Sequence, residues 1–164
     1  MNPVKEYGKV DYDLTSLIEE VRSIPPSAWK YRNDPESYET MSLSSGSPHF
    51  PEQSVQGLLN QTEILFGKPG YTNRVLLSCI PAGKSILPHT DDFSVAIRSK
   101  SYHCHIPIIT KPGIIMGFPD DGLEIYMEPG FLYSIDETRK HYVNNPTDLD
   151  RVHLLFAYFP HYGK

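Results

Sequence analysis

Residues 102–135 decide the fold, and they read YHCHIPIITKPGIIMGFPDDGLEIYMEPGFLYSI. Short apolar runs alternate in this stretch with turns that contain proline and glycine. Several short strands at such close spacing are typical of a β-sandwich or a β-barrel. We therefore predict a mainly β fold with flanking helices, a jelly roll of the cupin-like kind. Its strands here are 102–109, 113–118, 123–127 and 131–135.

The same pattern extends beyond this stretch in both directions. It predicts further strands at Arg74–Ile80, Ser94–Ile97 and Arg151–Phe159. Helices are predicted over Asp13–Ile24 and Pro51–Phe66, because each carries its apolar residues on one side and is followed by proline or glycine. We expect these two helices to pack outside the jelly roll.

The length of 164 residues fits one domain with a sizeable core. No internal repeat, low-complexity tract or long linker divides the chain, so we expect a single domain over 1–164. In this interpretation 1–72 form a helical or irregular support, and 73–160 form the jelly-roll catalytic core. Within the support, Trp29–Phe50 is rich in Ser, Pro, Tyr and Asn and is predicted to be irregular or edge structure.

Composition limits the classes of partner. The net charge is -5 and no basic run stands out, so we expect no nucleic-acid partner. No apolar stretch reaches membrane-spanning length and the first residues lack a signal-peptide core, which predicts a soluble cytoplasmic protein without a membrane partner. Cys79 and Cys104 match no zinc or redox spacing and are expected to be buried free thiols. The oligomeric state stays open.

His89 and Asp91 are the first candidates for metal ligands. They point to the same face if their segment is extended, because side chains two apart in a strand share a face. His141 is the best third ligand, since it follows the run 131–135 and precedes the turn-like 144–146, at a strand entrance. Two imidazoles and a carboxylate suit Fe(II) with open positions, whereas a structural zinc site wants four ligands, usually with thiolates.

The last predicted strand opens with an arginine, and alternation along it gives two faces: Arg151, His153, Leu155 and Ala157 against Val152, Leu154, Phe156 and Tyr158. A buried Arg151 needs a partner, and the guanidinium fork matches a carboxylate. The dicarboxylic keto acid 2-oxoglutarate would give one carboxylate to Arg151 and chelate iron with its other end, leaving one position for O2. The alternative is a surface ion pair of Arg151 with Asp148 or Asp150.

Two further observations bear on this site. A His-x-Asp triplet alone is weak evidence, and Asp92 competes with Asp91, although its side chain should point to the opposite face. His103 and His105 share a face of their strand and could form a rival metal site. Because His89, Asp91 and His141 already make a complete set, we interpret His105 as a neutral or cationic donor to the cosubstrate.

Three segments resemble the aspartyl/asparaginyl β-hydroxylase-like branch of the Fe(II)/2-oxoglutarate dioxygenases. They are Pro88–Asp91, Tyr102–Ile108, and His141–Pro146 continuing through Asp150–Leu154. The resemblance covers about Arg74 to Phe159, roughly half of the chain. The last segment is the most specific, because a histidine, an Asn-Pro turn and an arginine occur there at fixed spacing and open a strand.

The resemblance implies a double-stranded β-helix, iron held by His89 and His141, and 2-oxoglutarate held by Arg151. It also implies cosubstrate contacts for Ser78 and His105. Some members have glycine where Asp91 stands, and the carboxylate here favours the standard triad. The position of His103 is often arginine in the family, which leaves open what His103 contacts. The N-terminal third carries no family signature, and substrate choice is expected there.

The function expected from these residues is hydroxylation of an unactivated C–H bond, with succinate and CO2 as co-products. The substrate would be an Asp-, Asn- or Pro-type residue in a peptide or protein, a free amino acid, or a small metabolite. Aromatic residues could line a peptide cleft or fill the barrel: Tyr31, Tyr38, Tyr71, Phe93, Tyr102, Tyr126 and Tyr133. Two alternatives remain, a cupin-like metalloenzyme that does not use 2-oxoglutarate and a non-catalytic jelly-roll binding module.

Overall fold

The structure is a computed structural model that describes residues 1–34, 38–91 and 100–161. Its strands within these residues are β1 Val4–Lys9, β2 Lys30–Asp34, β3 Tyr38–Ser44, β4 Gly70–Ile80, β5 Ser85–His89, β6 Tyr102–Ile109, β7 Ile115–Phe118, β8 Leu123–Ile125, β9 Phe131–Ile135, β10 His141–Asn144 and β11 Arg151–Pro160. The helices are α1 Thr15–Arg22 and α2 Glu52–Phe66, with 3-10 turns η1 Pro26–Ala28 and η2 Pro119–Asp121.

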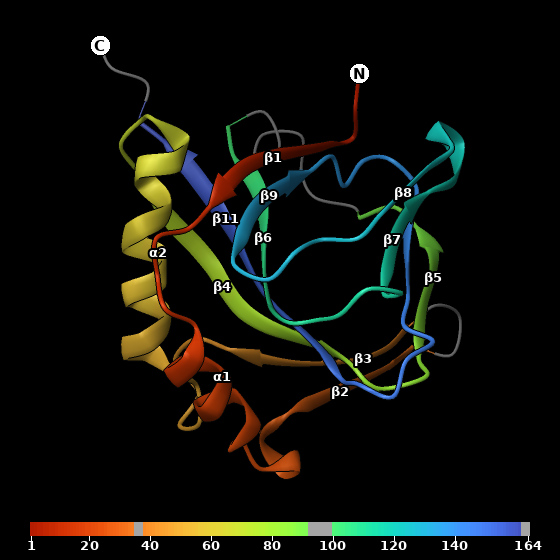
Figure 1. The fold of residues 1–164 in the computed structure, drawn as a ribbon, viewed down its shortest axis with the longest axis horizontal. Helices are drawn as coiled ribbons and strands as arrows, with labels where there is room; N and C mark the ends of the chain where they lie inside the picture. Colours follow the sequence, from red (N-terminus) through yellow and green to blue (C-terminus); the bar gives the residue numbers. More distant parts are fainter. Residues whose placement is uncertain (35–37, 92–99, 162–164) are drawn as a thin grey trace.

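The described strands join in one antiparallel sheet. Their order is β1-β9-β6-β11-β4-β3-β5-β10-β7-β8, and β2 pairs with β3 beside this path. Figure 1 shows α1 and α2 on one side of the molecule, next to β4 and β11, and β5, β7 and β8 on the opposite side. The sheet therefore curls upon itself, with the helices outside it, as the jelly-roll prediction requires.

The alternation predicted for the last strand is confirmed. In β11, Val152, Leu154, Phe156 and Tyr158 belong to the larger hydrophobic core, together with Leu17 of α1 and Leu58 of α2. Leu154, Leu17 and Leu58 are fully buried. The opposite face of β11 points into the curled sheet, where Arg151, Leu155 and Ala157 line a cavity. The strand thus connects the core under the helices to the interior of the barrel.

The N-terminal third contributes more sheet than the sequence indicates. The expectation of irregular or edge structure for Trp29–Phe50 is wrong for β3, which lies inside the sheet between β4 and β5. Three hydroxyl side chains of β3 line the interior cavity, namely Thr40, Ser42 and Ser44. A strand whose inward face is polar shows no hydrophobic alternation, so hydropathy does not reveal it. The predicted strand Ser94–Ile97 lies outside the described residues.

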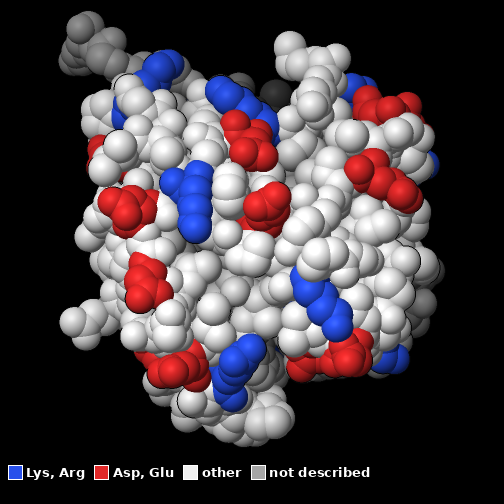
Figure 2. All heavy atoms as spheres, in the orientation of Figure 1, with Lys and Arg blue, Asp and Glu red and all other residues white. Residues whose placement is uncertain are grey.

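The distribution of charge on the surface and the state of the two cysteines agree with the predictions made from composition. Figure 2 shows Lys and Arg interspersed with Asp and Glu over the face in view. No helix among the described residues is long and apolar enough to cross a membrane. Cys79 and Cys104 are buried free thiols, as predicted, and burial raises the pKa of Cys79 to about 12.

We predict that Leu154→Ala lowers the free energy of unfolding by about 2–5 kcal/mol, because it leaves a cavity in the core beneath the helices. Leu155→Ala is the matched control: the neighbouring side chain is only half-buried and faces the interior cavity. Urea unfolding should show the smaller loss for Leu155→Ala. Equal losses for the two variants would contradict the assignment of faces along β11.

Candidate metal and cosubstrate site

A cavity of about 1000 Å³ occupies the interior of the curled sheet. Its walls come from strands β3, β4, β5, β6, β7, β9, β10 and β11. All seven residues predicted for the site line this one cavity: Ser78, His89, Asp91, His103, His105, His141 and Arg151. Residues up to 73 positions apart in the chain therefore meet at one place, as the metal and cosubstrate hypothesis requires.

Strand pairing brings the candidate metal ligands together. β10 pairs with β5 in a register that places His141 directly opposite His89. The centroids of the two imidazole rings are 4.4 Å apart. Asp91 follows β5, and its backbone N–H donates to the carbonyl of Glu137 at 3.1 Å, which fixes the chain just beyond the strand. The side chain of Asp91 is thereby held beside both histidines.

The three ligand groups converge on a common point. His89 Nε2 lies 3.5 Å from Asp91 Oδ1, and His141 Nε2 lies 3.6 Å from Asp91 Oδ2. Neighbouring ligand atoms around a six-coordinate ion with bonds of about 2.1 Å are about 3 Å apart, so a small closure would bring all three into coordination. Among the described residues, this is the one group of three or more His, Cys, Asp or Glu side chains that could hold a metal.

Hydrogen bonds select the tautomer that a metal needs. His89 Nδ1 donates to the carbonyl of Leu87 at 2.8 Å, and His141 Nδ1 donates to the carbonyl of Arg139 at 2.8 Å. A carbonyl only accepts, so both Nδ1 atoms carry a proton and both Nε2 atoms present a lone pair toward Asp91 in the neutral form. Metal-binding histidines in proteins are commonly oriented in this way.

The pKa of Asp91 reflects the same convergence. Burial alone would raise it, but the adjacent His141 and His89 outweigh burial and hold the pKa of Asp91 below its usual value. The carboxylate is therefore ionised at neutral pH. Each Nε2 faces it, as an N–H donor when the ring is protonated and through its lone pair on a shared cation when the ring is neutral. A divalent cation satisfies all three groups at once, which makes the donor set fit a metal of the Fe(II) type.

The turn between β10 and β11 positions Arg151. Asn145 is fully buried, and its side-chain amide donates to the carbonyls of Ile80 and Leu149 at 3.1 and 2.8 Å. Its Oδ1 accepts from the backbone N–H of Thr147 at 3.2 Å. These bonds tie the turn to the end of β4, where Arg151 pairs with Ile80. The Asn-Pro turn seen in the sequence thus has a structural role.

Arg151 is a buried cation in need of a counter-ion. It is 3% exposed, and burial lowers its pKa to about 9, so it stays protonated at neutral pH. No carboxylate of the described chain pairs with it. The alternative of a surface pair is wrong, because Asp148 binds Lys111 and Asp150 Oδ1 accepts from the N–H of Ala82. A carboxylate ligand would satisfy this guanidinium.

Two histidines act on the guanidinium, the buried His153 and the half-buried His105. Arg151 Nη2 donates to His153 Nδ1 at 2.9 Å, and His153 is 2% exposed. Burial and Arg151 lower the pKa of His105 to about 3 and that of His153 well below its usual value, so both rings are neutral. His105 Nδ1 is buried without a protein partner and is free to bond to a ligand. The sequence analysis predicted this role for His105. For His153 it predicted only that the side chain lies on the same face of β11 as Arg151.

The rival metal site at His103 and His105 does not form. His103 Nδ1 instead pairs with Glu137 Oε2 at 2.6 Å, and Glu137 is 5% exposed. Sequence reasoning missed Glu137, because it follows β9 within Asp136-Glu137-Thr138, which has the composition of an exposed turn. Only the register of β9 on β6 places it, since Ile135 pairs with His103, and no local sequence signal reveals that pairing. Asp92, the other sequence candidate, lies outside the described residues.

The aromatic residues whose side chains are described pack elsewhere. Tyr102 stacks on Phe66 with ring centroids 5.8 Å apart, and Tyr71 stacks on Phe159 at 5.0 Å. Tyr133 is buried in the second core cluster, and neither it nor Tyr126 lines the cavity. Phe93 and the side chains of Tyr31 and Tyr38 lie outside what the structure describes. The hypothesis of an aromatic peptide cleft is therefore not supported by these four tyrosines.

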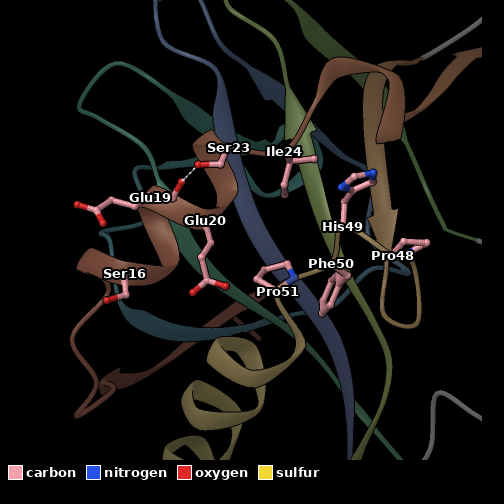
Figure 3. A pocket seen from close by; sticks show the side chains of 9 residues that line it. All are labelled: Ser16, Glu19, Glu20, Ser23, Ile24, Pro48, His49, Phe50 and Pro51. Atoms are coloured by element: carbon pink, nitrogen blue, oxygen red, sulfur yellow. Dashed lines mark hydrogen bonds between the residues drawn. The ribbon is translucent and has the colours of Figure 1, made fainter.

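A second hollow of about 460 Å³ lies on the outside of the protein, between α1 and residues 48–51. Figure 3 shows its side chains, with Glu19 and Glu20 coming from α1 and His49 from the segment before α2. It is shallow and open, and these groups do not converge as the interior ligands do. The interior cavity is therefore the candidate functional site.

Solved structures show which fold the chain shares. The viral collagen prolyl hydroxylase of Paramecium Bursaria Chlorella virus-1, solved with 2-oxoglutarate, matches with a TM-score of 0.65 at 10% identity over 98% of this chain and 97% of its own. The Trichoplax adhaerens prolyl hydroxylase, solved with a hypoxia inducible factor peptide, matches with a TM-score of 0.71 at 12% identity over 98% and 84%. A Pseudomonas putida prolyl-4-hydroxylase gives 0.63 at 12% identity over 98% and 94%. These matches confirm the double-stranded β-helix.

The family follows from the sequence itself. The family model for aspartyl/asparaginyl beta-hydroxylase matches residues 5–160, nearly the whole chain, and the protein belongs to this family. No curated protein matches the chain by sequence. Membership makes the protein a hydroxylase of the Fe(II)- and 2-oxoglutarate-dependent dioxygenase class. It confirms the predicted enzyme class and contradicts the alternative of a non-catalytic binding module.

We predict that His141→Ala removes high-affinity binding of Mn(II), a stable substitute for Fe(II), because two ligands remain where three are needed. The matched control is His49→Ala, since His49 is exposed and far from the interior cavity. Electron paramagnetic resonance of added Mn(II) measures the bound fraction. The assignment of His141 is wrong if both variants bind Mn(II) as the unchanged protein does.

Proposed function

We propose that this protein binds Fe(II) through His89, Asp91 and His141 and 2-oxoglutarate through Arg151, and that it hydroxylates an amino-acid residue. The observation that carries this proposal is the buried Arg151, which no carboxylate of the described residues neutralises, in the same cavity as the convergent triad. A metal site alone fits many enzymes, but a metal site that shares its cavity with a buried cation fits a chelating dicarboxylate.

Each residue has a distinct task in this proposal. His89, Asp91 and His141 occupy one side of the metal and leave the other positions open. Arg151 binds the far carboxylate of 2-oxoglutarate, while His153 holds the guanidinium in place. His105 and Ser78 donate hydrogen bonds to the cosubstrate from adjacent strands. When bound, Fe(II) with 2-oxoglutarate and O2 supplies the oxidising power for an unactivated C–H bond, and succinate and CO2 are released.

We propose a peptide or protein as the source of the substrate residue, which is of the Asp, Asn or Pro type. One structural relative of the same fold was solved with a peptide. The cavity is also lined by hydroxyl and amide side chains that suit the polar groups of a peptide backbone: Thr40, Ser42, Ser44, Gln56, Thr72 and Asn73. A free amino acid presents the same groups and is the second candidate.

Arg151→Leu should weaken 2-oxoglutarate binding by roughly 30-fold or more, because a charge-assisted pair in a buried site is lost. Binding of pyruvate, a keto acid without the second carboxylate, should change less than about threefold, since only the far carboxylate contacts Arg151. Calorimetry on the Mn(II)-loaded protein measures both affinities.

Arg22→Leu is the control, because Arg22 is exposed on α1. Equal losses for the two keto acids would indicate general damage to the cavity. An unchanged affinity for 2-oxoglutarate would contradict the role of Arg151 and favour a cupin-like metalloenzyme that does not use this cosubstrate.

A further inference from the structure

Glu137 is a carboxylate in the cavity that the proposed chemistry does not use. It lines the same cavity as the candidate metal ligands and is 5% exposed. Its backbone carbonyl accepts the N–H of Asp91 at 3.1 Å, so it adjoins the triad without being part of it. Acidic residues are rarely buried to this extent unless a partner compensates the charge.

Among the described residues, one side chain acts as such a partner. His103 Nδ1 lies 2.6 Å from Glu137 Oε2, and within the described chain no lysine or arginine pairs with this carboxylate. The other oxygen, Oε1, is buried and has no hydrogen-bond partner. An ionised carboxylate accepts several hydrogen bonds, so one side of Glu137 is left unsatisfied.

The position of this carboxylate points to the substrate and not to the cosubstrate. Arg151 pairs with Ile80 at one end of β11, whereas Ala157, six residues along, pairs with His103 and Asn73 near its other end. At about 3.3 Å per strand residue, this is a backbone offset of about 20 Å, which the long side chain of Arg151 shortens. In the proposed function the far carboxylate of the keto acid lies at Arg151, and an anionic cosubstrate does not neutralise Glu137, so this carboxylate is left for a second ligand.

We propose that Glu137, held in place by His103, binds a cationic nitrogen group of the substrate, an ammonium or a guanidinium, and so selects which substrate enters. This inference rests on the proposed function, because it assigns the specificity of the same site. A cation gives the strongest hydrogen bond to a carboxylate and neutralises its charge. A small rotation about the last side-chain bond, which is soft, presents either oxygen to the cavity.

Binding of matched probes tests this proposal without turnover. The protein is loaded with Mn(II) and 2-oxoglutarate and titrated in a calorimeter with N-acetyl-argininamide and with its neutral isostere N-acetyl-citrullinamide. A second pair, N-acetyl-lysinamide and its Nε-acetylated form, distinguishes an ammonium from a guanidinium. We expect at least one cation to bind about tenfold or more tightly than its neutral counterpart.

Variants then show which residue causes the preference for the cation. Glu137→Gln keeps the shape and the bond from His103 but loses the charge, so the preference for the cation should fall to about twofold or less. Glu137→Asp retains the charge and should keep part of the preference. Glu6→Gln, an exposed glutamate on β1, is the matched control and should keep all of it. Thermal unfolding of each variant shows whether it folds.

The proposal is overturned if the unchanged protein does not prefer either cation, or if Glu137→Gln keeps the full preference. The first of these outcomes needs no variant, so it stands even if Glu137→Gln fails to fold. Succinate release from 2-oxoglutarate is measured separately, in air, on the same purified proteins loaded with Fe(II) in place of Mn(II). Absence of release with a retained preference for the cation counts against the proposed activity and leaves the Glu137 site supported.

Discussion

The antiparallel pairing of β10 with β5 is the constraint on which the site depends. Its register places His141 opposite His89, and a bulge between His141 and Val143 separates this pair from the regular pairing of Asn144 with Ser85. Side chains in a strand alternate between faces, so a slip by one residue would turn His141 out of the cavity. The register therefore decides whether the chain has a metal centre at all.

The polar interior of the barrel lowers the stability of the fold. The apolar core between the sheet and the helices compensates for this loss. Arg151, Glu137 and the Nδ1 atom of His105 are buried with incomplete hydrogen bonding or charge pairing. Such groups lower stability unless a ligand satisfies them, which is a common property of functional sites. The apolar layer between the sheet and the two helices is largely buried, and most of its residues do not line the cavity. Metal and keto acid should therefore stabilise the fold as they bind.

Both helices and the strands β6, β7, β8, β9 and β11 follow from local sequence patterns, whereas β10 was not predicted as a strand. Leu14, Leu17 and Val21 give α1 its apolar side, and Gly67 ends α2 with a φ of 64°, a conformation that glycine adopts without strain. The two-residue spacing of His89 and Asp91 predicted their common direction, and the strand alternation predicted which side of β11 carries Arg151. These features depend on neighbours in sequence, so one chain is enough to find them.

Features that depend on strand order could not be predicted in this way. β3 enters the middle of the sheet although its cavity-facing residues are hydroxylated, and only its pairing with β4 and β5 shows this. Glu137 meets His103 because β9 pairs with β6, and the sequence offers no sign of that pairing. His153 was placed on the correct face of β11, but its bond to Arg151 requires two side-chain conformations that local patterns do not fix.

The central claim is that His89, Asp91 and His141 share one metal ion in the cavity that holds Arg151. Diffraction from crystals loaded with Fe(II) and 2-oxoglutarate without oxygen, recorded at the iron absorption edge, tests it directly. The account predicts one anomalous peak within about 2.3 Å of both Nε2 atoms and of a carboxylate oxygen of Asp91, with the keto acid reaching from it to Arg151. A peak at His103 and Glu137, or a keto acid bound away from Arg151, would contradict it.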